Sequence, residues 1–219
     1  MKFLLILAFL LLAGCTMRPP SASAFMGAYQ TRNGTSGPRV SFFASKYHAF
    51  KPDSTTMAEA GYDHWDWDDV VAEEWTVDLN FALHYFIRHF EIGAGFQWMN
   101  PYVTMGFASD HFGVMGWTDW RILAGFKSMG AGVSVMEQIS PVQKMQLGLM
   151  QFVSQSWGFY TAGFDDVKEP YSYGFREVGA GIYMLYSGSE KYSANFELKY
   201  SYDWVWNANR LAFSLGISM

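Results

Sequence analysis

The sequence predicts an all-β protein that folds as an antiparallel up-and-down transmembrane β-barrel of about ten strands. Apolar and polar residues alternate with a period of two along much of the chain, which is the period of a strand. Bulky residues gather on one face of this alternation, and small polar residues gather on the other. Charged residues make up only 16% of the 219 residues and aromatic residues 19%, so part of the aromatic surface is expected to face something other than water.

Charge and composition narrow the function classes. The formal net charge is −5 and Lys and Arg do not cluster, which argues against a nucleic-acid partner. The length fits one core-bearing domain. The chain has one cysteine, so no disulfide within one chain can contribute to its stability.

The chain begins with an export signal. Lys2 precedes an apolar run at 3–13, a length typical of a secretory signal rather than a membrane span. The next motif, Leu12-Ala13-Gly14-Cys15, resembles the lipobox of bacterial lipoproteins. The resemblance implies removal of residues 1–14, acylation of Cys15 and, from Thr16 at the following position, delivery to the outer membrane.

Ordinary signal cleavage after Ala22-Ser23-Ala24 is the alternative, because small residues stand at the required positions. Residues 15–37 are rich in small and turn-forming types, so they are interpreted as the lipidated N-terminus and a flexible tether. The barrel domain is then expected over 38–219.

The strands follow from the alternation. It is clearest in 75–85, 192–202 and 211–219. The last of these resembles the terminal targeting strand of bacterial outer-membrane barrels, although Met219 stands where that family usually has Phe. The expected spans are 38–50, 73–86, 89–99, 112–127, 130–139, 143–153, 156–164, 172–187, 191–203 and 209–219, and eight or twelve strands are alternatives.

An even number of strands puts both ends of the barrel domain on one side, which a lipid-tethered N-terminus would make periplasmic. Short turns are expected there at 87–89, 127–130 and 187–191. Longer loops are expected on the outer side, at 51–72, 100–111, 164–171 and 204–209. Trp75, Trp98, Trp204 and Trp206 would form an aromatic girdle near the outer rim, with Trp157 at the opposite interface.

The bulky face is interpreted as lipid-facing, because the other face carries few long charged side chains. A soluble lipocalin-like lipoprotein is the alternative, in which the bulky face would line an internal cavity.

The longest expected loop concentrates acidic groups and tryptophans. It is interpreted as a solvated loop, with contact to a sugar or a partner protein as the alternative. A calcium site is not expected, because the spacing lacks the required Gly and Glu. The candidate contact residues are Trp65, Asp66, Trp67, Asp68 and Asp69.

The face opposite the lipid carries the other candidates. A narrow barrel is filled by its own side chains, so a paired interior network is expected, with a narrow pore or a small-ligand pocket as the alternative. The candidate network residues are Asp78, His84, Glu91, Arg121, Lys127, Glu197 and Lys199, with Asn80, Gln97, Ser134 and Asn195 on the same face.

An enzyme is a weaker hypothesis. Lipid A deacylase barrels are similar in size and in stretches such as 121–126, but the His-x-Ser motif of that family is missing, because no histidine here has Ser two places later.

The motif Gly-Ala-Gly occurs three times, at 93–95, at 130–132 (Gly130-Ala131-Gly132) and at 179–181. In strands such glycines leave room for large neighbours.

These observations together predict an outer-membrane β-barrel lipoprotein with a structural or surface-interaction role exerted through its outer loops. A narrow transporter or ligand-binding barrel is the second hypothesis and a lipid-modifying enzyme the third. The expected partners are outer-membrane lipid and a surface or periplasmic protein, and no cofactor or metal is expected.

Overall fold

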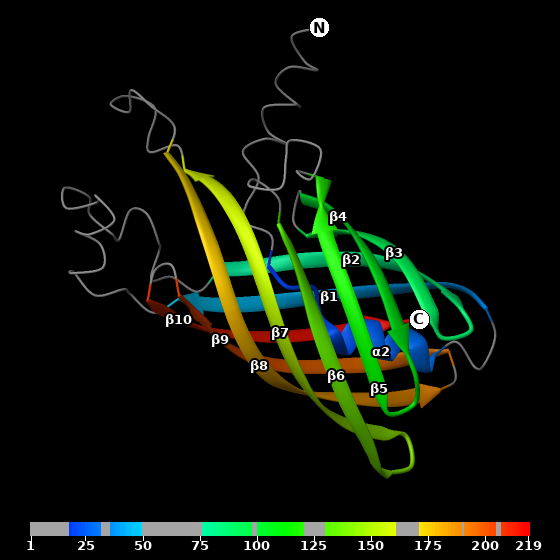
Figure 1. The fold of residues 1–219 in the computed structure, drawn as a ribbon. Helices are drawn as coiled ribbons and strands as arrows, with labels where there is room; N and C mark the ends of the chain where they lie inside the picture. The colour runs from blue at the N-terminus through cyan, green and yellow to red at the C-terminus, as the bar shows by residue number, and fades with distance from the viewer. Residues whose placement is uncertain are drawn as a thin grey trace, which may run out of the picture.

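Ten antiparallel strands close into a barrel, with each strand paired to its sequence neighbours and β1 paired to β10 (Figure 1). This confirms the predicted fold class and the count of ten. The structure is a computed structural model and describes residues 18–31, 36–49, 76–97, 100–120, 130–160, 171–189, 191–204 and 207–219. The elements are α2 (Ala22–Gln30), β1 (Gly37–Ala49), β2 (Thr76–Ile87), β3 (Phe90–Gln97), β4 (Asn100–Ala108), β5 (Phe112–Asp119), β6 (Ala131–Val142), β7 (Met145–Tyr160), β8 (Tyr171–Ser189), β9 (Tyr192–Asp203) and β10 (Ala208–Ser218).

The two ends of the barrel differ in their connections. The turn end carries the short links between β2 and β3, β4 and β5, β6 and β7, and β8 and β9. The loop end carries the links that follow β1, β3, β5, β7 and β9. Gly37 pairs with Phe86 and Ser41 with Ser218, so β1 begins and β10 ends at the turn end, as an even number of strands requires.

Two predicted boundaries are wrong, and the errors cancel in the strand count. The stretch 100–111 was expected to be a loop, but β4 occupies most of it. Pro101 is the second residue of β4, near the strand start where a missing N–H is tolerated. The separate strands expected at 143–153 and 156–164 are one strand, β7.

Because of these boundary changes, two features lie at the opposite end of the barrel from the end that the sequence predicted. The link that contains 127–130 lies at the loop end, whereas it was expected among the short turns. Trp157 pairs with Gly174 near the loop end of β7, whereas it was expected at the opposite interface. Trp204 is exposed at the loop end, as predicted. Trp75, Trp98 and Trp206 lie outside the described residues.

The outer face of the barrel is apolar. Along β2, Leu79 and Leu83 face outward with 59% and 42% of their surface exposed, while Asn80 and Ala82 between them are buried. The same alternation runs through β3, β5 and β9. Large apolar side chains therefore cover the exterior of the described strands, which contradicts the alternative of a bulky face enclosing a cavity.

The lumen is occupied by α2, which lies inside the ring of strands (Figure 1). The expectation of a flexible tether is therefore wrong for residues 18–31. Every residue from Ala22 to Tyr29 is buried, and a helix that is buried on all sides belongs in a core. None of the described helices is long and apolar enough to cross a membrane.

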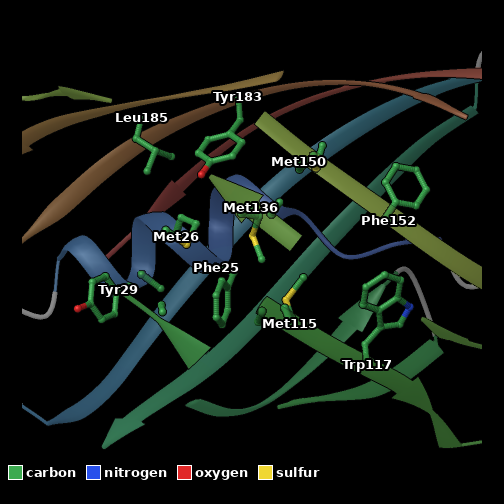
Figure 2. Packing of buried hydrophobic residues seen from close by; sticks show 14 of the residues in the cluster. Phe25, Met26, Tyr29, Met115, Trp117, Met136, Met150, Phe152, Tyr183 and Leu185 are labelled. Atoms are coloured by element: carbon green, nitrogen blue, oxygen red, sulfur yellow. The ribbon is translucent and has the colours of Figure 1, made fainter. Parts of the chain in front are cut away.

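Residue size explains how a helix fits in so narrow a barrel. On the side of β9 and β10, α2 presents Ala24 and Gly27, and a Cβ on Gly27 would lie 2.6 Å from Asn195 Oδ1. On the other side it presents Phe25, Met26 and Tyr29, which join an apolar cluster with methionines of β5, β6 and β7 (Figure 2). The helix backbone thus lies against one wall and large side chains fill the space to the other.

Glycines in the strands make room for these large lumen side chains. A Cβ on Gly106 would lie 2.8 Å from the Phe25 ring. A Cβ on Gly132 would lie 2.3 Å from the Trp117 ring. These are closer than real Cβ contacts, so the space is available only because the residue has no side chain. The interpretation of Gly130-Ala131-Gly132 as a barrel-shaping motif is confirmed at Gly132.

Candidate functional site

The candidate site is the plugged lumen, defined as α2, its lead-in 18–21 and the strand residues that hold them. Three polar clusters line it at different heights. Each contains residues that the sequence alternation places on the inner face.

The first cluster binds the start of α2. Ser21 caps the helix by accepting a hydrogen bond from Ala24 N at 3.0 Å, as Ser commonly does at this position. Glu197 is fully buried and accepts bonds from Ser21 Oγ at 3.0 Å and Ser23 N at 2.8 Å. A carboxylate at a helix N-terminus is favourable because the exposed N–H groups carry partial positive charge.

Lys199 completes this cluster. Its Nζ lies 2.8 Å from Glu197 Oε1 and donates to the carbonyl of Pro19 at 3.1 Å. The pair also bonds to the plug on both sides, because Glu197 Oε2 accepts from Ser21 and Ser23 while Lys199 donates to Pro19. The pair therefore connects β9 to the lead-in of α2.

The second cluster lies nearer the loop end. Arg210 Nη2 donates to Asp203 Oδ2 at 2.8 Å, and its Nη1 lies 3.4 Å from Glu177 Oε2. Ser154 and Ser201 also donate to Glu177, at 3.0 and 2.7 Å. All five side chains are buried, so this network joins β7, β8, β9 and β10 across the interior.

The third cluster lies on β2, β3 and β4. His84 Nδ1 is 2.9 Å from Glu91 Oε1, and Thr104 donates to the same oxygen at 2.7 Å. The Phe25 ring meets the His84 ring edge-on, with centroids 6.2 Å apart. A hydrolytic site would need a nucleophile hydrogen-bonded to the imidazole, and within the described residues no hydroxyl is bonded to His84.

The predicted network residues are only partly brought together. The structure pairs His84 with Glu91 and Glu197 with Lys199. Asp78 is half-buried on the same inner face. Arg121 and Lys127 lie outside the described residues, as do Cys15 and the loop residues Trp65, Asp66, Trp67, Asp68 and Asp69.

Sequence reasoning missed eight polar residues of the three clusters. Asp203 has the same parity as Glu197 and Lys199, so extending the alternation by two steps would have found it. Ser21 before a run of small residues and Met was a readable helix start. The remaining missed residues are Ser23, Thr104, Ser154, Glu177, Ser201 and Arg210.

Little space remains beside the plug. Between Pro19, Lys199 and Arg210 there is a void of about 20 Å³, room for one water molecule at most. A much larger hollow of about 940 Å³ lies against outward-facing residues such as Leu149 and Ile182, on the outer wall. The arrangement can hold a helix firmly, and the void beside its lead-in is too small for a solute.

Comparisons with solved structures found proteins that resemble this chain over most of its length at low sequence identity. The neisserial surface protein A is 11% identical over 84% of this chain and 98% of that one, with a TM-score of 0.44. The Ail attachment invasion locus protein of Yersinia pestis is 12% identical over 84% and 97%, with a TM-score of 0.40. The N-terminal barrel of Pseudomonas aeruginosa OprF is 10% identical over 84% and 100%, with a TM-score of 0.37.

No protein-family model matches the chain. No curated protein matches it either. At the identities found among solved structures, nothing about function carries over to this chain.

Proposed function

We propose that this protein is an outer-membrane β-barrel lipoprotein whose lumen is closed by its own N-terminal helix. It acts structurally or through the surface at its loop end, rather than as a pore. The single observation that carries this proposal is the buried helix α2, held by Glu197 and Lys199 and leaving only about 20 Å³ beside its lead-in.

The apolar exterior supports insertion in a membrane. Outward residues near the middle of the strands, such as Leu79, Ile182 and Leu215, have more than half of their surface exposed. A soluble protein rarely exposes so continuous an apolar surface, whereas a barrel in lipid requires one. The turn end carries only short links, whereas the longest links, those after β1, β5 and β7, all lie at the loop end. This difference favours a periplasmic turn end and an external loop end.

The plug contacts support processing upstream of residue 18. Cleavage after Ala24 would remove Ser21 and Ser23, and with them both hydrogen bonds from the helix start to Glu197. A fully buried carboxylate would then lose two donors, which is costly. Lipobox processing, with an acyl group on Cys15, keeps the whole plug in the mature chain.

The experiment that tests the proposal is conductance in planar bilayers of the intact protein extracted from outer membranes. We expect no steady conductance from the wild type, because α2 fills the lumen. A Phe25→Ala, Met26→Ala variant leaves a gap on the far side of the helix and is expected to show intermittent openings. Steady solute-permeable conductance of the wild type would refute the closed lumen and favour the narrow transporter.

A further inference from the structure

The direction of α2 through the barrel can be read at one wall. Arg18 N donates to Gln97 Oε1 at 2.8 Å, and Gln97 is the last residue of β3 at the loop end. At the other end of the segment, Tyr29 Oη lies 3.0 Å from His89 Nδ1, and His89 is in the turn that precedes β3. The segment therefore contacts both ends of the same strand, with its first residue at the loop end.

The opposite wall gives the same direction. Pro19 accepts from Lys199 at 3.1 Å, and Gly27 lies against Asn195. Because β9 runs from Tyr192 at the turn end towards the loop end, the residue nearer the start of the chain again lies nearer the loop end. The Gly27 backbone also approaches Ser218, the last residue of β10 at the turn end.

The segment that contains α2 thus passes through the lumen, and β1, the first strand of the barrel, comes after it in the chain. The chain descends through the lumen as α2, reaches the turn end near Tyr29, and starts β1 there at Gly37. The start of the barrel domain and the start of the described chain are therefore at opposite ends. This differs from the sequence-based expectation of an N-terminus tethered on the turn side.

We propose that the barrel delivers its N-terminal segment through the lumen to the loop end, so that an acyl group on Cys15 anchors in the leaflet on that side. This rests on the proposed function for the membrane and for the lipid. With α2 docked, two residues lie between Cys15 and Arg18, and the three Cα–Cα steps span at most about 11 Å. The nine residues of α2 alone span about 14 Å, so Cys15 does not reach the turn end.

The consequence is a lipid anchor at the cell surface if the loop end is external. The plug then has a second role beside closing the lumen, because it fixes which leaflet receives the acyl chains. The contacts of Glu197 and Lys199 with the helix start hold the lead-in at that height. Loss of the plug would release the anchor from this position.

The test uses a site-specific protease added to intact cells that express the full chain. Its recognition sequence is inserted between Met17 and Arg18, in a second variant within the 161–170 loop, and in a third at the Gln143-Lys144 turn. We expect the N-terminal site to be cut in intact cells together with the 161–170 site, with loss of a palmitate label from the barrel. The 143–144 site is expected to be cut only after permeabilisation.

The outcomes separate this inference from the proposed function. An N-terminal site that behaves like the 143–144 site overturns the inference and leaves the barrel proposal intact. If intact cells protect the 161–170 site but not the 143–144 site, the proposed orientation is refuted. The inference then predicts that the N-terminal site is protected in intact cells as well. If the N-terminal insertion fails to fold, Arg18→Cys in a Cys15→Ser chain, labelled with a membrane-impermeant maleimide, gives the same comparison against a cysteine in each of the other two positions.

Discussion

Replacing Glu197 with Ala is expected to loosen the plug while the barrel stays closed. Glu197 is fully buried and accepts from Ser21 Oγ at 3.0 Å and from Ser23 N at 2.8 Å. A hydrogen bond to a charged group contributes about 1.5–3 kcal/mol. Because both bonds share one oxygen, we take about 3 kcal/mol for the pair rather than their sum.

This loss sets the size of the measurable effect. A change of about 3 kcal/mol in the docking free energy corresponds to roughly a hundredfold larger undocked population, at about 1.4 kcal/mol per factor of ten. Hydrogen exchange of the backbone amides in a peptide covering 22–31, measured by mass spectrometry in detergent, should accelerate by about that factor. Peptides from the strands should change much less.

Two matched variants support the interpretation. Glu197→Gln keeps an oxygen acceptor without the charge, so its effect should be smaller than that of Glu197→Ala. Ser45→Ala removes a lumen hydrogen bond of 2.7 Å to Ser214 that does not involve α2, and it should leave exchange in 22–31 unchanged. Equal exchange in wild type and Glu197→Ala, with both barrels folded, would refute the account of how the plug is held.

Two further substitutions test the two faces of the wall. Ile182→Lys places a charge on the exposed outer face near the middle of β8, and should cost about 2–4 kcal/mol in urea unfolding from lipid vesicles. An unchanged unfolding midpoint would contradict the lipid-facing assignment. Gly132→Val should lower the temperature at which the barrel unfolds in SDS, because a Cβ there would lie 2.3 Å from the Trp117 ring. Gly116→Ala, whose Cβ would have no neighbour closer than 3.8 Å, should be tolerated, and a similar loss in both would show that the Trp117 contact is not the cause.

The faces of the strands could be predicted because side-chain parity reports directly on which side of a sheet a residue lies. The run from Tyr192 to Tyr202 therefore gave the buried Glu197 and Lys199 without a structure. Strand boundaries were less readable. Asn100-Pro101 is a turn signal in most contexts. The expected spans 143–153 and 156–164 left a break at Ser154 and Gln155, although Ser154 lies within β7 and donates to Glu177 in the lumen.

The helix could not be recognised as a plug from local sequence. Its Ala, Ser and Gly residues are those of a linker, and the same small residues let a helix lie against β9 and β10. Its stability comes from burial in the closed barrel, because nine residues are too few for an isolated helix to be stable. The alternation along β9 and β10 places Asp203 and Arg210 on the inner face. Their pairing could not be predicted from it, because the pair depends on the closed interior.

The most direct test of the central claim is a disulfide between the plug and the wall. A Cβ on Gly27 would lie 3.0 Å from Ser218 Oγ, close to the separation of a Cβ from the far sulfur across an S–S bond of about 2.05 Å. The Asn195 side chain must move to make room for the new side chain at position 27. The substitution of Ser218 removes the 2.7 Å hydrogen bond from Asn195 to Ser218 Oγ, so the Asn195 side chain can move. The variant is Gly27→Cys, Ser218→Cys in a Cys15→Ser chain, oxidised in isolated outer membranes.

Mass spectrometry of the digested protein then reports the cross-link. The account predicts a disulfide between positions 27 and 218 in most of the folded chains. A control pair, Gly27→Cys with Ser154→Cys, should stay reduced, because Ser154 bonds to Glu177 in the cluster nearer the loop end. Folded barrels that form no 27–218 disulfide, or that form both pairs equally, would contradict the claim that residues 22–30 close the lumen.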